Sequence, residues 1–151
     1  MLQLAVDADR EAVNAMARQV HALHVAWRPD IFEMTEQMYT VERFRSAVAD
    51  RQLYVAKLDG ETVGYALLVV RSADRPGLVK RKVMLLEEIC VDTQYRRQGI
   101  GRQMVEDVKA LARAFGCTDI QLGVYPQNTA ALALYESAGM RIRSVDLQMK
   151  V

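Results

Sequence analysis

The sequence contains little cysteine and no arrangement of residues that predicts a covalent or metal staple. Its two cysteines, Cys90 and Cys117, are too few for a disulfide framework or an all-cysteine zinc site, and they form no C-x-x-C pair. His21 and His24 have no Asp or Glu spaced to complete a metal site. We therefore expect reduced thiols and no metal. With 151 residues, 51% of them hydrophobic, the chain can bury a core as a single domain over residues 1–151.

A strong charge imbalance and long hydrophobic runs are also absent. The formal net charge is +1, so no global field favours nucleic acid or an anionic membrane as partner. No apolar run approaches the roughly 18 residues that a membrane helix needs. The first residues turn acidic and polar too soon for a signal peptide. We therefore expect a cytoplasmic protein with no nucleic-acid or membrane partner, in which any anion site is local.

The hydrophobic pattern that is present predicts alternating strands and helices. Period-two or continuous apolar runs predict strands over residues 2–6, 53–58, 62–70, 79–91, 120–124 and 140–150. Apolar residues at spacings of three and four predict helices over residues 9–27, 41–49, 100–115 and 128–138. Asp9 is the expected N-cap of the first helix, and Asp59-Gly60 is a hairpin signal. The order β-α-α-β-β-β-α-β-α-β predicts a mixed α/β fold with helices on both faces of one sheet.

The most informative segment joins the strand ending at Val91 to the helix that follows it. Residues 91–101 read VDTQYRRQGIG, so the turn opens directly into a helix. The first turn of a helix presents unpaired N–H groups and the positive end of the dipole, which together bind anions. Gly99 and Gly101 have no side chain to keep a phosphate from the backbone. The segment therefore predicts a phosphate site, although a turn with solvated arginines would have the same spacing.

Two common nucleotide motifs fail at the level of single residues. A mononucleotide P-loop requires G-x-x-x-x-G-K-S/T, and no such string occurs in the chain. A dinucleotide fingerprint requires a third glycine where Met104 stands. The phosphate ligand must therefore be of another kind.

Two longer strings resemble one known family. Val91-Asp-x-x-Tyr95-Arg96-x-x-Gly99-x-Gly101 resembles motif A of the GNAT family of N-acetyltransferases, and residues 122–140 (LGVYPQNTAALALYESAGM) resemble its motif B. The resemblance implies a twisted, mostly antiparallel sheet flanked by helices. It also implies transfer of an acetyl group from acetyl-CoA to an amine, directly within a ternary complex.

The same resemblance implies which residues hold the cofactor. The residues that would bind the coenzyme A pyrophosphate are Arg96, Arg97, Gln98, Gly99, Ile100, Gly101 and Arg102. The residues that would pair through their backbone with the pantetheine arm are Ile89, Cys90 and Val91. Small members of the family are often homodimers, so a homodimer is expected.

Two residues of the predicted helix over 128–138 are candidates for cofactor contact and proton transfer. Asn128 is a good N-cap and, seven residues before Tyr135, lies on the same helical face. Asn128 could therefore hold the pantetheine while Tyr135 reaches the sulfur. A phenol with a reference pKa of about 10 keeps its proton at neutral pH and could donate it to the departing thiolate. The resemblance places the general acid at Tyr135; spacing alone fits a packing tyrosine equally well.

Glu87 and Glu88 are candidates for the base that deprotonates the amine. A carboxylate in an apolar strand is costly without partners or water, so the pair requires an explanation. Strand alternation sends the two side chains to opposite faces. The resemblance favours Glu87, whereas a β-bulge would favour Glu88, and ion pairing at a strand surface would explain either residue without catalysis.

Other readings of the function remain open on sequence alone. Cys90 could carry the acyl group in a ping-pong reaction, although a buried cysteine is usually a small hydrophobic residue. The chain could also be a non-catalytic acyl-CoA sensor, or could use a longer acyl group. The acceptor is a small-molecule amine or a protein amine. From the family layout, the residues expected to frame its cleft are Trp27, Met34, Met38 and Tyr39.

Overall fold

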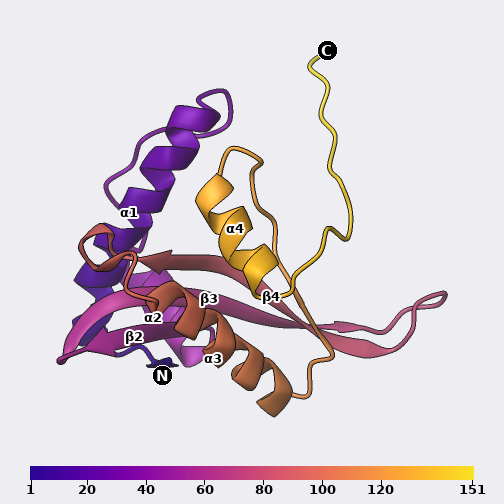
Figure 1. Ribbon diagram of the computed structural model, residues 1–151, viewed down its shortest axis with the longest axis horizontal. Helices are drawn as coiled ribbons and strands as arrows, with labels where there is room; N and C mark the ends of the chain where they lie inside the picture. Colours follow the sequence, from indigo (N-terminus) through magenta and orange to yellow (C-terminus); the bar gives the residue numbers. More distant parts are fainter.

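A computed structural model describes all 151 residues and contains one five-stranded sheet in the order β1-β2-β3-β4-β5 (Figure 1). The strands are β1 (Gln3–Leu4), β2 (Leu53–Leu58), β3 (Glu61–Ala73), β4 (Arg81–Val91) and β5 (Asp119–Gln121). The first three pairings are antiparallel, and β4 pairs with β5 in parallel. The mixed, mostly antiparallel sheet that the sequence predicted is therefore confirmed.

Helices cover both faces of this sheet. The helical segments are the 3-10 turn η1 (Asp7–Asp9), α1 (Arg10–Trp27), α2 (Val41–Ala49), the 3-10 turn η2 (Thr93–Tyr95), α3 (Ile100–Ala114) and α4 (Thr129–Ser137). One apolar cluster joins α3 and α4 to the sheet through Met104, Val108 and Tyr135. A second cluster joins α1 and α2 to the opposite face through Val13 and Phe44. None of the helices is both long and apolar enough to cross a membrane.

Two local predictions near the N-terminal half have different outcomes. The β2–β3 hairpin turns at Asp59 (φ +50°) and Gly60 (φ +85°), as the sequence predicted, because a tight hairpin needs two positive φ angles. Asp9 is the N-cap residue of α1, but its side chain accepts no hydrogen bond from the first turn of that helix. Its buried carboxylate instead accepts from the Val6 amide (2.9 Å) and the Thr62 hydroxyl (2.6 Å) and pairs with Lys57 (2.9 Å). The N-cap position predicted for Asp9 is confirmed, but its carboxylate closes η1 and contacts the sheet instead of capping the first turn of α1.

A β-bulge in β4 changes the direction of its side chains. Glu88 is opposite Leu67 and Leu86 is opposite Leu68, so Glu87 is an extra residue. Leu86 packs in the cluster below α3, whereas Cys90 packs in the cluster below α1. Since one extra residue resets the alternation, Glu87 and Glu88 both project from the α1 face. The prediction that they face opposite sides is wrong.

The last predicted strand, over residues 140–150, does not form. After the Met140 amide, no backbone group of the chain takes part in an intramolecular hydrogen bond. Residues 141–151 (hereafter the C-terminal tail) run as an extended segment away from the sheet (Figure 1). Alternating apolar and polar residues allow a segment to form a β-strand, but the strand must also pair with the edge of another strand. Within a single chain, no strand edge lies against the tail.

Candidate active site

The candidate site opens where β4 and β5 separate. Their parallel ladder ends at Leu85 opposite Gln121, just before the bulge at Glu87. Beyond that point β4 pairs only with β3, and the residues after β5 leave the sheet. The strand end from Ile89 to Val91 therefore has one unpaired edge. This is the segment predicted to pair with the pantetheine arm, and an unpaired strand edge is what such pairing requires.

The predicted pyrophosphate loop leads into the first turn of α3, and its backbone N–H donors are unused. Backbone N–H groups from Arg96 to Arg102 donate to no acceptor within the chain. They precede and open α3, a 15-residue helix whose dipole adds positive potential at this end. The Arg96 side chain donates to the Val91 carbonyl (3.1 Å), whereas Arg97 and Arg102 pair with no carboxylate. The arrangement gathers unused donors and unpaired positive charge in a chain with almost no net charge.

The two glycines of the loop serve different purposes. Gly99 has φ of +82°, and a Cβ added there would meet nothing within 4 Å. Its conformation suits glycine, and the space above it is open to a ligand. A Cβ at Gly101 would lie 3.5 Å from Leu134 Cδ2 and 3.7 Å from Val91 Cγ2, which is ordinary contact. Gly101 therefore lies where the loop packs against α4 and the end of β4.

The residues predicted on α4 lie beside this opening. Asn128 caps the helix, as predicted, by accepting from the Ala131 amide (3.2 Å). Tyr135 is 9% exposed and packs in the cluster below α3. Burial raises the pKa of Tyr135 to about 12, so the phenol keeps its proton at neutral pH. Its hydroxyl has no hydrogen-bond partner within the chain and is free to donate.

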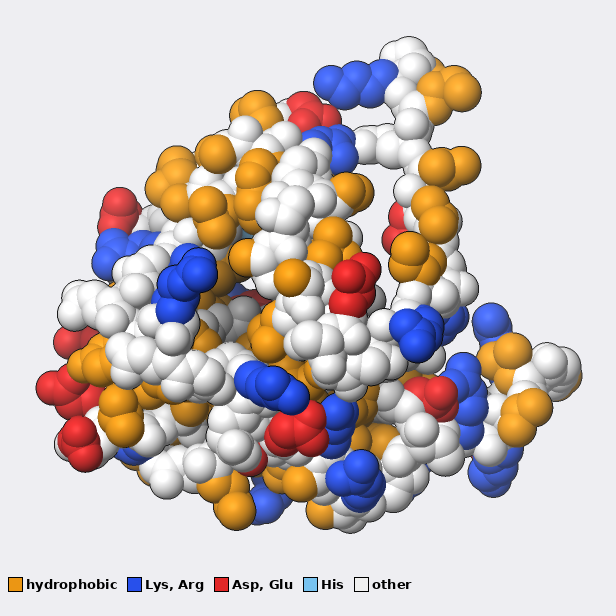
Figure 2. Space-filling view, viewed as in Figure 1, with side chains coloured by type: hydrophobic (Ala, Val, Ile, Leu, Met, Phe, Trp, Pro, Cys, Tyr) orange, Lys and Arg blue, Asp and Glu red, His pale blue; other side chains and the backbone are white.

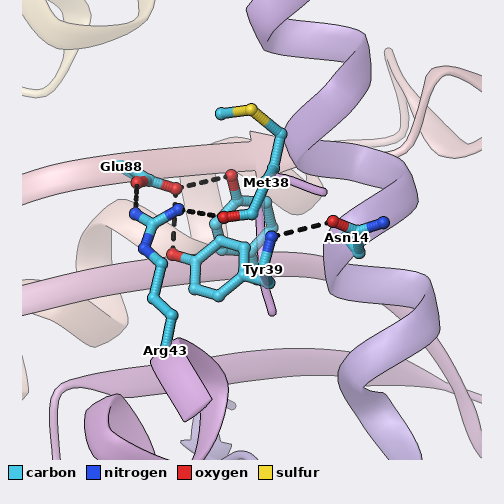
Figure 3. Close-up of polar contacts among 6 residues, drawn as sticks. Asn14, Met38, Tyr39, Arg43 and Glu88 are labelled. Carbon is cyan, nitrogen blue, oxygen red and sulfur yellow. Dashed lines mark hydrogen bonds and ion pairs between the residues drawn. The ribbon is translucent and has the colours of Figure 1, made fainter. Parts of the chain in front are cut away.

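Glu88 lies at the centre of a polar network between the α1–α2 segment and the sheet (Figure 3). One carboxylate oxygen accepts from the hydroxyls of Tyr65 (2.8 Å) and Tyr39 (3.0 Å), and the other accepts from Arg43 (2.6 Å). The Arg43 guanidinium also lies 4.0 Å from the centre of the Tyr39 ring. Burial raises the pKa of both phenols, and the Glu88 charge raises it further, so both remain donors. Glu88 thus ties Tyr39 and the start of α2 to β4.

Glu87 has no comparable set of partners. Its only ion pair, with Arg71, is 3.9 Å long, and its side chain is 42% exposed. Because of the bulge it projects from the same face as Glu88, so the bulge does not favour Glu88 over Glu87, contrary to the expectation from the sequence. Of the two carboxylates, Glu87 has free lone pairs and access to water, whereas three donors occupy most of the capacity of Glu88.

Cys90 is buried beneath α1, with its sulfur 3.7 Å from the Met16 carbonyl oxygen. Burial raises the pKa of Cys90 to about 11, although Arg96 acts in the opposite direction. At neutral pH the side chain is therefore a thiol, which is a poor nucleophile. This environment does not favour the ping-pong alternative.

We expect Cys90 to react with iodoacetamide at pH 8 about 100-fold more slowly than an ordinary cysteine, because its thiolate fraction falls tenfold per unit of raised pKa. Cys117, which is partly exposed and whose pKa burial also raises, supplies the internal comparison, and a free cysteine peptide supplies the ordinary rate. Peptide mass spectrometry of a time course would measure both rates. Equal labelling of the two cysteines would contradict the environment described for Cys90.

Comparison with known proteins agrees with this geometry. The sequence profile of the Acetyltransferase (GNAT) family matches residues 18–140. The chain belongs to the GNAT family. Mouse "N-acetyltransferase family 8 member 3" is 35% identical over 88 residues, which are 58% of this chain and 38% of that protein. An "N-alpha-acetyltransferase" of Sulfurisphaera tokodaii is 32% identical over 94 residues, which cover 58% of this chain and 55% of that protein. The GNAT chain thus spans less than two thirds of the length of either curated relative.

Solved structures extend the similarity over the whole GNAT chain. A mutant of the BH1408 protein from Bacillus halodurans superposes with a TM-score of 0.94 at 29% identity, covering 100% of this chain and 99% of that one. Aminoglycoside N-acetyltransferase AAC(6')-Iy, solved in complex with CoA, has a TM-score of 0.71 at 16% identity, covering 100% of both chains. The second likeness is one of fold alone.

Several residues around the GNAT site were not found from the sequence. No sequence pattern predicted that Tyr65 and Arg43 would contact Glu88. The sequence indicated only that a carboxylate in an apolar strand needs partners. Tyr39, expected at the acceptor cleft, is 0% exposed and holds Glu88 instead. That expectation is wrong, because the Tyr39 hydroxyl donates to Glu88 and the ring is packed in the core.

An aromatic cluster joins the end of α1 to the segment after β5. The His24 ring stacks on Phe32 (5.3 Å between centres) and lies 5.6 Å from both Trp27 and Tyr125. Burial lowers the pKa of His24, which favours a neutral, packed imidazole. His24 thus lies between Trp27 and Tyr125, and Met34 is 61% exposed.

Proposed function

We propose that this GNAT domain transfers an acetyl group from acetyl-CoA to an amine in a ternary complex. The observation that carries the proposal is the run of unused backbone donors from Arg96 to Arg102, adjacent to the unpaired edge of β4. Pyrophosphate would bind the donors, and the pantetheine arm would pair along residues 89–91 toward the bulge. Asn128 would contact the arm from the other side. The residues present therefore fit acetyl-CoA.

In the proposed reaction, one bond forms and one bond breaks at the same carbonyl carbon. The amine nitrogen forms a bond to this carbon after Glu87, directly or through water, removes its proton. The nitrogen of the resulting adduct loses its second proton to solvent, the carbon–sulfur bond breaks, and Tyr135 donates its proton to the departing sulfur. Solvent later returns a proton to Tyr135 and accepts the one held by Glu87. The acceptor is proposed only as an amine, on a small molecule or a protein.

We also propose a cellular compartment and an oligomeric state. Both cysteines are unpaired, which supports a reducing compartment such as the cytoplasm. A homodimer is proposed from the family, whose small members are often homodimers.

The proposal is tested by incubating the protein with acetyl-CoA and a panel of polyamines, amino acids, aminoglycosides and peptides. Released thiol and product mass would be measured together, because mass also reports the length of the acyl group. Acetylated amine and stoichiometric free CoA are expected. Calorimetric binding of CoA without turnover on any amine would favour a sensor, and no binding would refute the proposal.

We expect substitutions of the two neighbouring glutamates to have different effects, one on the rate and the other on stability. Glu87→Gln should lower kcat about 100-fold or more at neutral pH, with the loss shrinking as pH rises and the free amine becomes abundant. Glu88→Gln should instead lower the melting temperature, because it leaves Arg43 without its ion pair. Steady-state kinetics across pH and thermal unfolding of both variants would measure this. A stable Glu88→Gln enzyme with the larger kinetic loss would transfer the base role to Glu88.

A further inference from the structure

The hairpin formed by β3 and β4 extends beyond the rest of the sheet (Figure 1). The last residue of β3 that pairs with β2 is Leu67, and the β5 pairing begins opposite Val83. From Ser72 to Lys82 the two arms pair with each other and with no other strand. A two-stranded hairpin is at best marginally stable by itself in water, so the length of this segment, residues 71–82 (hereafter the basic hairpin), requires an explanation.

The basic hairpin concentrates positive charge in a nearly neutral chain. It has five cationic residues and one anionic residue, a net charge of +4, so the rest of the chain carries −3. The cations are Arg71, Arg75, Lys80, Arg81 and Lys82. Arg75 and Lys82 form no ion pair. Even when Glu87 and Asp119, the two carboxylates outside the hairpin that pair with it, are counted, the net charge is +2.

These cations lie on both faces of the basic hairpin. Opposite residues share a face and neighbouring residues alternate, so Arg71 and Arg81 project from one face and Lys82 from the other. The two remaining cations belong to the loop that joins the strands. Figure 2 shows Lys and Arg side chains on both sides of the apolar ones at this end of the molecule, at the right of the view. A ligand along one face would meet part of this charge, whereas a surface approached end-on would meet all of it.

The tip of the basic hairpin is apolar. Leu78 is 48% exposed and Val79 is 80% exposed, and both belong to the loop between the strands. Charged residues on free strand edges protect a protein from aggregation, which would explain the cations alone. Protection from aggregation would not place two adjacent apolar side chains in water at the tip. The cations and the apolar tip therefore require one explanation together.

We propose that the basic hairpin docks end-on onto an anionic lipid surface, with Leu78 and Val79 inserted between the headgroups. The apolar side chains leave water, and each Lys or Arg close to an anionic leaflet adds attraction. An extended chain rises about 10 Å over the three residues from Val79 to Lys82. The headgroup layer is about 5–10 Å deep, so Lys82 lies among the lipid phosphates when Val79 reaches the boundary of the acyl chains.

The apolar tip favours a lipid surface over the other anions that a basic hairpin could bind. A nucleic-acid backbone or an acidic protein segment would lie along one face of the hairpin and leave Leu78 and Val79 in water. The expectation that the chain has no membrane partner rested on the charge of the whole chain. Attraction to a surface acts within about one Debye length, about 8 Å at physiological ionic strength, so the charge of the docked hairpin decides it.

The experiment measures flotation of the full chain with phosphatidylcholine vesicles and with vesicles of equal parts phosphatidylcholine and phosphatidylglycerol. The wild type should bind the anionic vesicles only, and less at high salt. Val79→Asp should lower the partition coefficient about tenfold or more, because an inserted apolar side chain becomes a carboxylate facing anionic lipid. Met34→Asp, at a residue 61% exposed between α1 and α2, is the matched control and should bind like the wild type. A wild type that binds no anionic vesicles, or equal loss in both variants, would overturn the proposal.

Charge reversal tests the cations separately from the apolar tip. Arg75→Glu with Lys82→Glu should weaken vesicle binding about 100-fold or more, because each cation near the surface contributes to attraction. Arg51→Glu with Arg113→Glu is the control, since both residues are exposed, form no ion pair and change the net charge equally. Equal weakening by the two pairs would refute docking through the hairpin. Binding of duplex DNA that Val79→Asp leaves intact, without binding of vesicles, would assign the hairpin to nucleic acid instead.

Insertion of the tip is tested independently of affinity. Trp27 is the only tryptophan, so Val79→Trp in a Trp27→Phe background places a single fluorophore at the tip. Lipids brominated on their acyl chains should quench it, whereas Met34→Trp in the same background should stay unquenched. Equal quenching of the two, or none at residue 79, would overturn the insertion. An unchanged melting temperature shows that Val79→Asp is folded, and calorimetric CoA binding tests the proposed function separately, because the pyrophosphate loop lies outside the hairpin.

Discussion

Gly99→Glu is expected to abolish measurable binding of acetyl-CoA. The substitution places a carboxylate where the N–H groups from Arg96 to Arg102 would meet pyrophosphate, so two anions would compete for one set of donors. It also removes the freedom that φ of +82° requires. Together these effects should weaken binding at least about 100-fold, or about 3 kcal/mol. Isothermal titration calorimetry with free CoA would measure it without any need for an acceptor.

Gly77→Glu is the matched control for strain and charge. Gly77 has φ of +85°, nothing lies within 4 Å of the Cβ that would be added, and the residue belongs to the loop between β3 and β4. This loop extends away from the body of the molecule (Figure 1). It therefore receives the same backbone strain and the same added charge away from the proposed site. CoA affinity equal to that of the wild type is expected. If both variants lost affinity alike, the loop would not be the pyrophosphate site.

Tyr135→Phe should lower kcat by at least about 100-fold while leaving CoA affinity almost unchanged. The ring is buried and Phe would keep its packing, so the substitution removes only the proton donor. General acid–base groups contribute about 10²–10⁴-fold to rate, which sets the expected range. Rates from a saturating acetyl-CoA assay and affinities from calorimetry would separate the two effects.

The pH profile gives the same residue a second test. A tyrosine with a pKa of about 12 keeps its proton below that pH, so deprotonation of Tyr135 should cause no loss of wild-type kcat up to pH 10.

Tyr54→Phe is the matched control for Tyr135→Phe, because Tyr54 belongs to the same cluster and its buried hydroxyl has no hydrogen-bond partner. It should leave turnover intact. Equal loss in both variants would show that Tyr135 acts through packing alone.

The strands and helices that the sequence predicted well are those with a local cause. Asp59-Gly60 has the conformation that a tight hairpin needs, and Asn128 has a side chain that caps whatever helix follows it. The loop before α3 was predictable for the same reason, since a glycine turn opening into a helix exposes donors in any fold.

What the sequence could not supply depends on residues that are distant in the chain. The bulge at Glu87 is a property of β3 and β4 together, so alternation within β4 alone gave the wrong face. The three donors around Glu88 come from the segment before α2, from α2 itself and from β3, and no spacing rule connects them. The tail shows the converse, because its pattern indicated a strand but not where its partner would come from.

The bulge makes the number of residues matter at this point of the chain, in addition to the identity of Glu87. Replacing Glu87 alters one side chain and leaves the direction of its neighbours unchanged. Deleting it would restore strict alternation and turn either the residues before it or those after it to the other face. Glu88 would then leave Tyr39 and Tyr65, or Leu86 would leave the cluster below α3. Relatives that keep this chemistry should therefore keep the number of residues here as strictly as they keep the carboxylate, whereas the β3–β4 loop around Gly77 can lengthen or shorten at little cost.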